Sequence, residues 1–163
     1  MDILAAQVGG ALKAHGLMLA TAESCTGGGV AQAITGIAGS SAWFERGFIT
    51  YSNLSKQQML GVAEATLITY GAVSEATVRA MVAGALRHSE AQVALAVSGV
   101  AGPDGGTPDK PVGTVWFAWG LKNGMTFARL HQLQGGRDKV RAQAVHIALL
   151  GVSELLQQTA STA

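Results

Sequence analysis

Charge, cysteine and proline are all scarce in this chain of 163 residues. Charged residues make up 13% of it, and the 11 Lys and Arg exceed the 10 Asp and Glu by one, so net charge gives no reason to expect nucleic acid or an anionic membrane as a partner. The single cysteine, Cys25, excludes an intrachain disulfide and a metal cluster of several cysteines. This pattern is typical of a reducing compartment, and we expect a cytoplasmic protein.

Long apolar runs are absent as well. Gly, Ser, Gln or a charged residue interrupts every stretch that approaches the roughly 20 apolar residues of a membrane-spanning helix. Residues 1–16 lack the basic start and the small-residue cleavage site of a signal peptide. We therefore expect neither export nor insertion into a membrane.

The chain has instead many short apolar stretches with regular spacing. Hydrophobic residues make up 48% of the sequence, and its 22 glycines are scattered rather than gathered in one tract. The length suits one domain with a core of its own. We see no internal repeat and no linker, so we expect a single domain over residues 1–163.

Helical and strand-like periodicity alternate along most of the chain. The expected helices are residues 2–15, a segment from Val30 to Ile37, residues 52–60 and 64–70, a helix capped by Ser74, and about 137–157. The expected strands are residues 17–21, 44–51, 93–97, 114–121 and 125–133. The last two flank an Asn-Gly pair that favours a tight hairpin turn. This order predicts an α/β fold with helices on both faces of one mixed sheet.

Three unusual segments each follow an expected strand directly: Ala22 to Gly28, Tyr51 to Lys56, and the loop at 99–113, which comes after Ser98. The loop holds all 3 prolines of the chain and 5 glycines, too many for regular structure. Ligands in open α/β sheets bind beyond the carboxyl ends of the strands. We therefore expect the three segments to form one site.

The segment Ala22 to Gly28 places small polar residues and glycines at the start of a helix, where free backbone N–H groups can hold an anion or an oxyanion. Because glycine is unfavourable inside a helix, the run of glycines suggests close approach of a ligand or of another backbone. A Ser24 or Thr26 that only caps the helix fits the same pattern. Cys25 is a weaker candidate nucleophile than Ser24, since a lone small residue under a turn is usually buried and inert.

Lys56 falls in the first turn of the expected helix, or just beyond it, if Ser52 or Asn53 is the cap. A helix N-terminus disfavours a positive charge, which would depress the lysine pKa toward the neutral base. A solvated surface lysine is the ordinary alternative.

The loop at 99–113 offers glycine N–H groups and a nearby Lys110 for a phosphate, or is a surface excursion without a ligand. It contains neither the dinucleotide nor the P-loop motif, so no nucleotide cofactor is expected. The histidines, His15, His88, His131 and His146, lack metal-ligand spacing, and no metal is expected.

Five ordered stretches carry a closer resemblance: AESCTGG (22–28), GSSAWFERGFITYSNLSK (39–56), GAVSEATV (71–78), SGVAGPDGG (98–106) and KPVGTVW (110–116). Together they resemble the CinA C-terminal domain family, and in particular its stand-alone members that deamidate nicotinamide mononucleotide. The match runs from about Val8 to Leu150. It implies an α/β/α sandwich that tends to form a homodimer.

The resemblance also implies an activity, the hydrolysis of the carboxamide of nicotinamide mononucleotide to nicotinic acid mononucleotide and ammonia in pyridine nucleotide (NAD) salvage. It assigns catalysis to Ser24, Tyr51 and Lys56, with Lys56 accepting the Ser24 proton directly or through Tyr51. Substrate contacts are expected from Glu23, Thr26, Gly27, Gly28, Asn53, Gly102, Asp104, Gly105 and Gly106. Of these, the N–H groups around Thr26 to Gly28 would hold the oxyanion, the loop glycines the phosphate, and Glu23 or Asp104 the pyridinium.

Two other functions fit the same residues. The chain could be a nucleotide-binding regulatory module without catalytic activity, because CinA proteins are associated by name with competence and DNA damage. It could also be a serine amidase for another small amide, with His131 or His146 as the base. A panel of amides separates these functions.

Overall fold

The computed structural model describes residues 2–162, and side chains as far as residue 158. The helices are α1 (Asp2–Ala14), α2 (Gly29–Thr35), a short 3-10 helix (Ser40–Ala42), α3 (Asn53–Leu60), α4 (Glu64–Tyr70), α5 (Glu75–Arg87) and α6 (Arg137–Thr162). The strands are β1 (Leu19–Glu23), β2 (Phe44–Ile49), β3 (Val93–Gly99), β4 (Thr114–Leu121) and β5 (Thr126–Gln132). No helix in the described part of the chain is long and apolar enough to cross a membrane.

The five strands form one mixed sheet in the order β2-β1-β3-β4-β5. β1 pairs in parallel with both β2 and β3, whereas β4 is antiparallel to β3 and β5 to β4. The hairpin of β4 and β5 forms around the Asn-Gly turn, as the sequence predicts. The mixed sheet with helices on its faces is thus confirmed.

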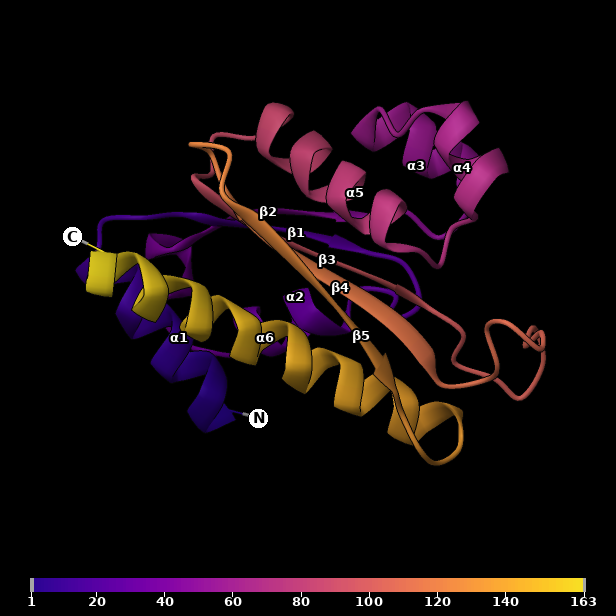
Figure 1. The fold of residues 1–163 in the computed structure, drawn as a ribbon. Coiled ribbons are helices and arrows are strands. Elements are labelled where there is room, and N and C mark those ends of the chain that lie inside the picture. The colour runs from indigo at the N-terminus through magenta and orange to yellow at the C-terminus, as the bar shows by residue number, and fades with distance from the viewer. Residues whose placement is uncertain (1, 163) are drawn as a thin grey trace.

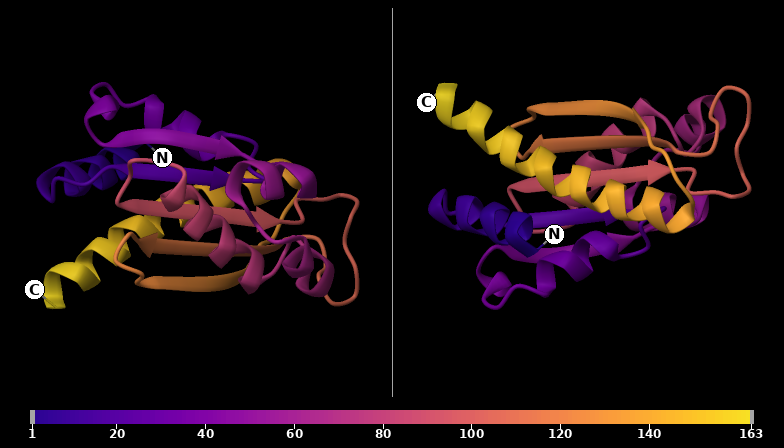
Figure 2. Two further views of the ribbon diagram at one scale, coloured as in Figure 1. Left: turned by 90° about the horizontal axis from the view of Figure 1, so that it is seen from above. Right: turned by 90° about the horizontal axis from the view of Figure 1, so that it is seen from below.

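Helices cover both faces of the sheet and make a three-layer sandwich. α1, α2 and α6 lie on one face, and α5 lies on the other with α3 and α4 beside it (Figures 1 and 2). Alternate residues of the strands pack into two separate hydrophobic cores, one on each face of the sheet. Leu19, Leu95 and Phe117 belong to the core under α6, and Ala20 and Ala94 to the core under α5. This alternation fixes the face toward which each residue at a strand end points.

The observed elements differ from the expected ones chiefly at their ends. β1 begins at Leu19 and continues to Glu23, because all five of its residues are buried between neighbouring strands. β2 ends at Ile49, so Tyr51 lies in the loop after the strand and does not end it. Ser74 caps α5 as predicted, accepting a hydrogen bond from the Thr77 N–H.

The chain order of the strands places a crevice at the end of β1. After β1 the chain moves to β2 on one side, and it later crosses to β3 on the other side. A reversal of this kind opens a gap between the loops beyond the carboxyl ends of the strands, where α/β proteins bind their ligands. Ser24 directly follows β1 at this point.

Candidate active site

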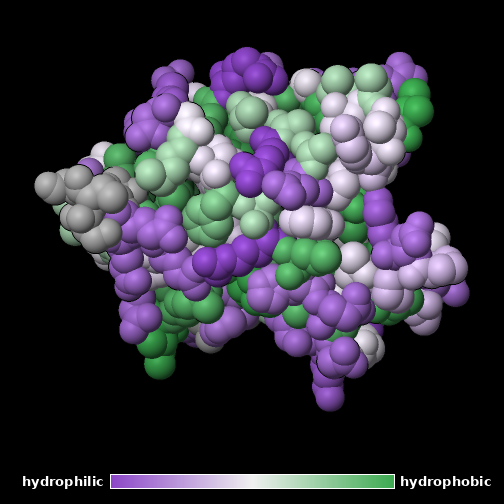
Figure 3. Space-filling view, in the orientation of Figure 1, coloured by the Kyte–Doolittle hydropathy of each residue, from purple (hydrophilic) through white to green (hydrophobic). Residues whose placement is uncertain are grey.

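A pocket of about 300 Å³ lies beyond the carboxyl ends of β1 and β3. In the space-filling view the surface is hollowed between the lobe that holds α3 and α4 and the loop at 99–113 (Figure 3). The lining residues are Ser24, Cys25, Tyr51, Asn53, Lys56, Ala72, Val73, Ser98, Gly99, Val100, Ala101, Gly102, Asp104, Gly105 and Arg137. All three segments singled out in the sequence therefore contribute to one pocket.

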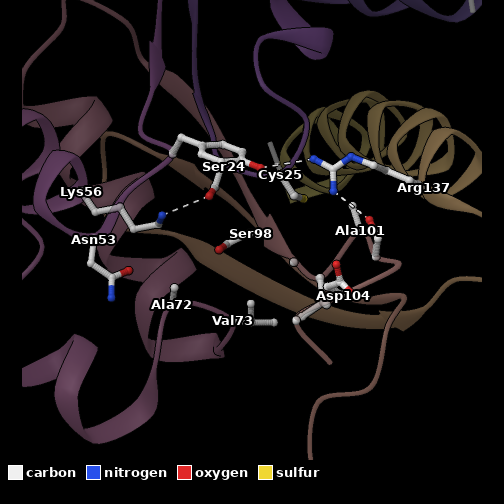
Figure 4. Close-up of a pocket in the computed structure, with 15 residues that line it drawn as sticks. Ser24, Cys25, Asn53, Lys56, Ala72, Val73, Ser98, Ala101, Asp104 and Arg137 are labelled. Atoms are coloured by element: carbon white, nitrogen blue, oxygen red, sulfur yellow. Dashed lines mark hydrogen bonds between the residues drawn. The ribbon is translucent and has the colours of Figure 1, made fainter. Parts of the chain in front are cut away.

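Ser24 is held at the floor of this pocket by the backbone of the sheet. Its N–H donates to the Val97 carbonyl at 3.0 Å, which continues the parallel pairing of β1 with β3 by one residue. Its side chain is 7% exposed and points away from α2, on the face that carries Ala22. The hydroxyl is thus fixed by a rigid strand and opens into the pocket (Figure 4).

Lys56 reaches Ser24 from α3. Its Nζ lies 3.0 Å from Ser24 Oγ and donates to the Thr50 carbonyl at 2.8 Å. Ser52 caps α3 in a reciprocal capping box with Ser55, which places Lys56 one residue further into the helix. The expected position of Lys56 at the start of the helix is therefore correct, and the alternative of a solvated surface lysine is wrong because the side chain is 1% exposed.

Burial lowers the pKa of Lys56 below its usual range and outweighs the opposing effect of Cys25. No carboxylate among the described side chains forms an ion pair with the ammonium group. A buried amine without a counter-ion favours its neutral form. Neutral Lys56 carries a lone pair that can accept the proton of the Ser24 hydroxyl.

Glu23 occupies the opposite side of the same strand end. Its carboxylate accepts hydrogen bonds from the Thr26 hydroxyl at 2.6 Å, the Val30 N–H at 2.9 Å and the Ala31 N–H at 3.0 Å. It therefore holds the first N–H groups of α2, and neither Ser24 nor Thr26 caps this helix. The structure places Glu23 and Thr26 outside the pocket lining, so neither lies where a substrate contact was expected.

The glycines after Thr26 are needed for the turn. Gly27 and Gly28 have φ angles of +59° and +102°, which side chains rarely tolerate, and both precede α2 rather than lying inside it. Neither lines the pocket, and the Gly27 N–H donates to the Ser24 carbonyl at 3.0 Å. The turn conformation accounts for these glycines without a ligand, and their expected role in holding the oxyanion stays a prediction.

Cys25 lies beneath this turn, as expected for a lone cysteine. It is 6% exposed, and burial raises the pKa of its thiol to about 11. A thiol with this pKa is almost entirely protonated near neutrality and is a weak nucleophile. Its backbone N–H donates to no other residue in the described part of the chain and approaches only its own thiol.

Tyr51 stands at the rim of the pocket with 62% of its surface exposed. Its hydroxyl accepts a hydrogen bond from Arg137 Nη2 at 3.3 Å, while Arg137 Nη1 donates to the Gly102 carbonyl at 2.8 Å (Figure 4). No hydrogen bond joins the Tyr51 hydroxyl to Ser24 or to Lys56 in the described part of the chain. Lys56 contacts Ser24 directly.

The loop at 99–113 supplies one wall of the pocket. Gly102, Asp104 and Gly105 line it, as does Asn53 at the first residue of α3. Gly106 does not, because it packs against Val112. Lys110 also points elsewhere, and its ammonium donates to the Tyr70 carbonyl at 2.7 Å, tying the loop to α4.

Among the pocket residues that the sequence analysis did not name as site residues, two have polar side chains, Ser98 and Arg137. From the sequence, Ser98 was expected only at the end of a strand. That strand, β3, pairs with β1, and the pairing places Ser98 beside Ser24. Arg137 begins α6, more than 80 residues after Tyr51. A positive charge at the first residue of a helix is unfavourable, and the reasoning that drew attention to Lys56 applies to Arg137 equally.

The arrangement can perform nucleophilic catalysis. It combines a serine hydroxyl on a rigid strand end, a buried amine within hydrogen-bond distance of it, and a cationic rim. His131 of β5 packs edge-on against Phe117 of β4, and His146 is exposed on α6. Neither histidine lines the pocket, so neither is placed to act as the base.

Comparison with known proteins gives consistent matches over nearly the whole chain. The family model "CinA C-terminal domain" matches residues 1–156. "Nicotinamide-nucleotide amidohydrolase PncC" of Escherichia coli strain K12 is 56% identical over 157 residues, which are 96% of this chain and 95% of that protein. The protein of the same name from Pseudomonas putida is 53% identical and covers 93% of this chain and 94% of its own length.

A solved structure of similar sequence has the same fold over nearly the whole chain. The crystal structure of "competence/damage inducible protein CihA" from Agrobacterium tumefaciens superposes with a TM-score of 0.92 at 46% identity, and the match covers 94% of each chain.

Proposed function

The chain belongs to the CinA C-terminal domain family, and from this membership we propose that it hydrolyses the carboxamide of nicotinamide mononucleotide to nicotinic acid mononucleotide and ammonia. The observation that carries the proposal is the 3.0 Å contact between Ser24 Oγ and Lys56 Nζ at the floor of the pocket. Relatives more than 50% identical along the whole chain are named for this activity.

Ser24 is the nucleophile in this proposal and Lys56 the base. An amide is a poor electrophile, so the serine must lose its proton as it attacks the carbonyl carbon. Neutral Lys56 accepts that proton directly, and the resulting ammonium then delivers it to the leaving nitrogen, so that ammonia departs. Water attacks the acyl-enzyme next, with Lys56 again as the base, and releases the carboxylate product.

The oxyanion that forms on the carbonyl carbon needs donors close to Ser24. Of the N–H groups around Thr26 to Gly28 that the sequence suggested, that of Gly27 donates to the Ser24 carbonyl, and none of these residues lines the pocket. We assign this role to the backbone N–H of Cys25, which follows the nucleophile, lines the pocket and donates to no other residue in the described chain. The residue after a nucleophile at a strand-to-helix turn supplies an oxyanion donor in other hydrolases.

The phosphate and the pyridinium ring need partners of opposite charge. We assign the phosphate to Arg137 together with Gly102 and Gly105, because arginine presents several N–H donors in a geometry that suits phosphate. Asp104 remains a candidate for the pyridinium, since it lines the pocket and Glu23 does not. The exposed ring of Tyr51 offers a second surface for the cation.

The cellular setting completes the proposal. We expect the reaction to serve NAD salvage in the cytoplasm, and the protein to act as a homodimer without a metal or another cofactor. Size-exclusion chromatography with light scattering measures the oligomeric state.

The decisive experiment compares nicotinamide, its riboside and its mononucleotide as substrates of the purified protein, with release of ammonia as the readout. We expect turnover of the mononucleotide, little turnover of the other two, and no turnover by Ser24→Ala. A regulatory module would release no ammonia from any of the three. An amidase for another compound would not prefer the mononucleotide.

A further inference from the structure

Ser98 lies beside the candidate nucleophile on the neighbouring strand. β1 and β3 are parallel, Glu23 is paired with Val97, and the Ser24 N–H donates to the Val97 carbonyl. Ser24 and Ser98 are therefore the next pair along the two strands. Both point to the face that carries Ala22 and Ala96, away from Glu23.

The hydroxyl of Ser98 has no hydrogen-bond partner among the described residues, although the residue is only 1% exposed. Two neighbouring buried hydroxyls are engaged, that of Thr26 with Glu23 and that of Thr50 with the Glu23 carbonyl. The Thr21 hydroxyl, on the opposite face of β1, also has no partner in the described chain, but unlike Ser98 it does not line the pocket. Figure 4 shows the Ser98 oxygen pointing into the pocket. Burying a hydroxyl without a partner is unfavourable, which indicates a partner that arrives with the substrate.

Ser98 and Lys56 approach the reacting carbon from different sides. Lys56 comes from α3, which follows β2, whereas Ser98 belongs to β3, and β1 lies between these two strands. A carboxamide attacked by Ser24 thus lies between the amine and the second hydroxyl. Its oxygen needs donors, which backbone N–H groups provide, and its NH₂ group needs an acceptor.

We propose that Ser98 accepts a hydrogen bond from the leaving carboxamide nitrogen and thereby makes the site selective for amides; this rests on the amidohydrolase function proposed above. Ser98 keeps its own proton throughout. The C–N bond breaks as Lys56 delivers the proton taken from Ser24 to the nitrogen, which leaves as ammonia. By holding one N–H of this group, Ser98 leaves the lone pair of the nitrogen facing Lys56 during this step.

The test compares an amide with an ester in the full-length protein. The substrates are nicotinamide mononucleotide and the O-methyl ester of nicotinic acid mononucleotide, whose leaving group has no N–H and is a weak acceptor. We expect Ser98→Ala to lower kcat/KM for the amide by about 10-fold to 100-fold and to change that for the ester much less. Ser98→Thr, which keeps the hydroxyl, should restore most of the activity on the amide.

Three results would overturn the inference: an unchanged amide reaction in Ser98→Ala, an equal loss on amide and ester, or no restoration by Ser98→Thr. Thermal unfolding checks each variant, and Ser98→Cys, which is similar in size and a poor acceptor, replaces Ser98→Ala if the alanine variant does not fold. A wild-type protein that releases no ammonia from nicotinamide mononucleotide would instead overturn the proposed function itself.

Discussion

Glu23 and Ser24 are adjacent in sequence, both are buried, and they serve opposite faces of the same strand end. On the α2 face, the Glu23 carboxylate is fully engaged, since it takes three hydrogen bonds from the turn and the helix that follow it, although the hydroxyl of nearby Thr21 has no partner among the described residues. On the α3 face, Ser24 meets a buried amine and an open pocket, and Ser98 beside it has no partner. A polar side chain with all its bonds satisfied holds the fold, whereas incompletely satisfied groups around a cavity are available for a substrate.

The same contrast separates the two arginines of α6. Arg141 donates to the carbonyls of Cys25 at 3.1 Å and Thr26 at 3.2 Å, and so fixes the turn that follows the nucleophile. Arg137, one helical turn earlier, reaches the rim of the pocket and joins the loop at Gly102 to Tyr51. α6 therefore supports the turn on the α2 face through Arg141 and the pocket through Arg137.

The largest effect that this comparison predicts concerns the nucleophile. Ser24→Ala should lower kcat for release of ammonia by a factor of about 10³ or more, because Ser24 is the hydroxyl that contacts the buried amine of Lys56. Cys25→Ala is the matched control, and it should keep most of the activity since the thiol is buried and protonated. Activity that survives in Ser24→Ala and disappears in Cys25→Ala would reassign the nucleophile.

The next effect concerns the base. Lys56→Arg keeps the positive charge but cannot give up its proton near neutrality, so kcat should fall by a factor of about 10² to 10⁴. In the wild type, kcat/KM should rise with pH through the lowered pKa of Lys56 and then level off, because only the neutral amine acts as the base. Near wild-type turnover in a folded Lys56→Arg protein would remove Lys56 from this role.

A smaller effect is expected at the rim. Arg137→Gln should lower kcat/KM for the mononucleotide by about tenfold or more, because a charge-assisted contact to the phosphate is lost. Activity on the riboside should not change, and the preference for the mononucleotide should narrow. A parallel loss on both substrates would mean that Arg137 only joins the loop to Tyr51.

A substitution on the α2 face of the strand end should change stability rather than catalysis. Glu23→Gln removes one acceptor oxygen and the negative charge at the start of α2, and should reduce the free energy of unfolding by about 1–3 kcal/mol. Denaturant unfolding measures this loss, and kcat per folded molecule should stay close to that of the wild type. A large fall in kcat at unchanged stability would place Glu23 in the chemistry and abolish the distinction between the two faces.

The last prediction links Lys56 to stability. Its pKa is lower in the folded state than in the unfolded state, so the unfolded chain binds more protons between these two values. Stability should therefore rise as the pH increases through that window. The difference between the wild type and Lys56→Met isolates this contribution, and it should shift in favour of the wild type as the pH rises. A difference independent of pH would show that Lys56 has an ordinary pKa.

Much of the fold was predictable from local pattern. The alternation of helices and strands and the hairpin at Asn123-Gly124 follow from periodicity and turn chemistry, and the parallel pairing with its shared carboxyl edge follows from the order of the elements. The three site segments could be named because each directly follows a strand. The sequence does not reveal the φ angles of Gly27 and Gly28, which explain these glycines without the close approach of a ligand that the sequence analysis expected.

The sequence by itself determined the elements, the proximity of the three segments and the candidates Ser24 and Lys56. Only the tertiary structure decided which groups each side chain meets. Glu23 and Ser24 are adjacent in sequence. Because side chains alternate along a strand, Glu23 points toward α2 and Ser24 toward the pocket. Arg137 and Ser98 enter the site through a distant helix and a neighbouring strand, because packing of the sheet and its helices joins residues whose separation along the chain carries no such information.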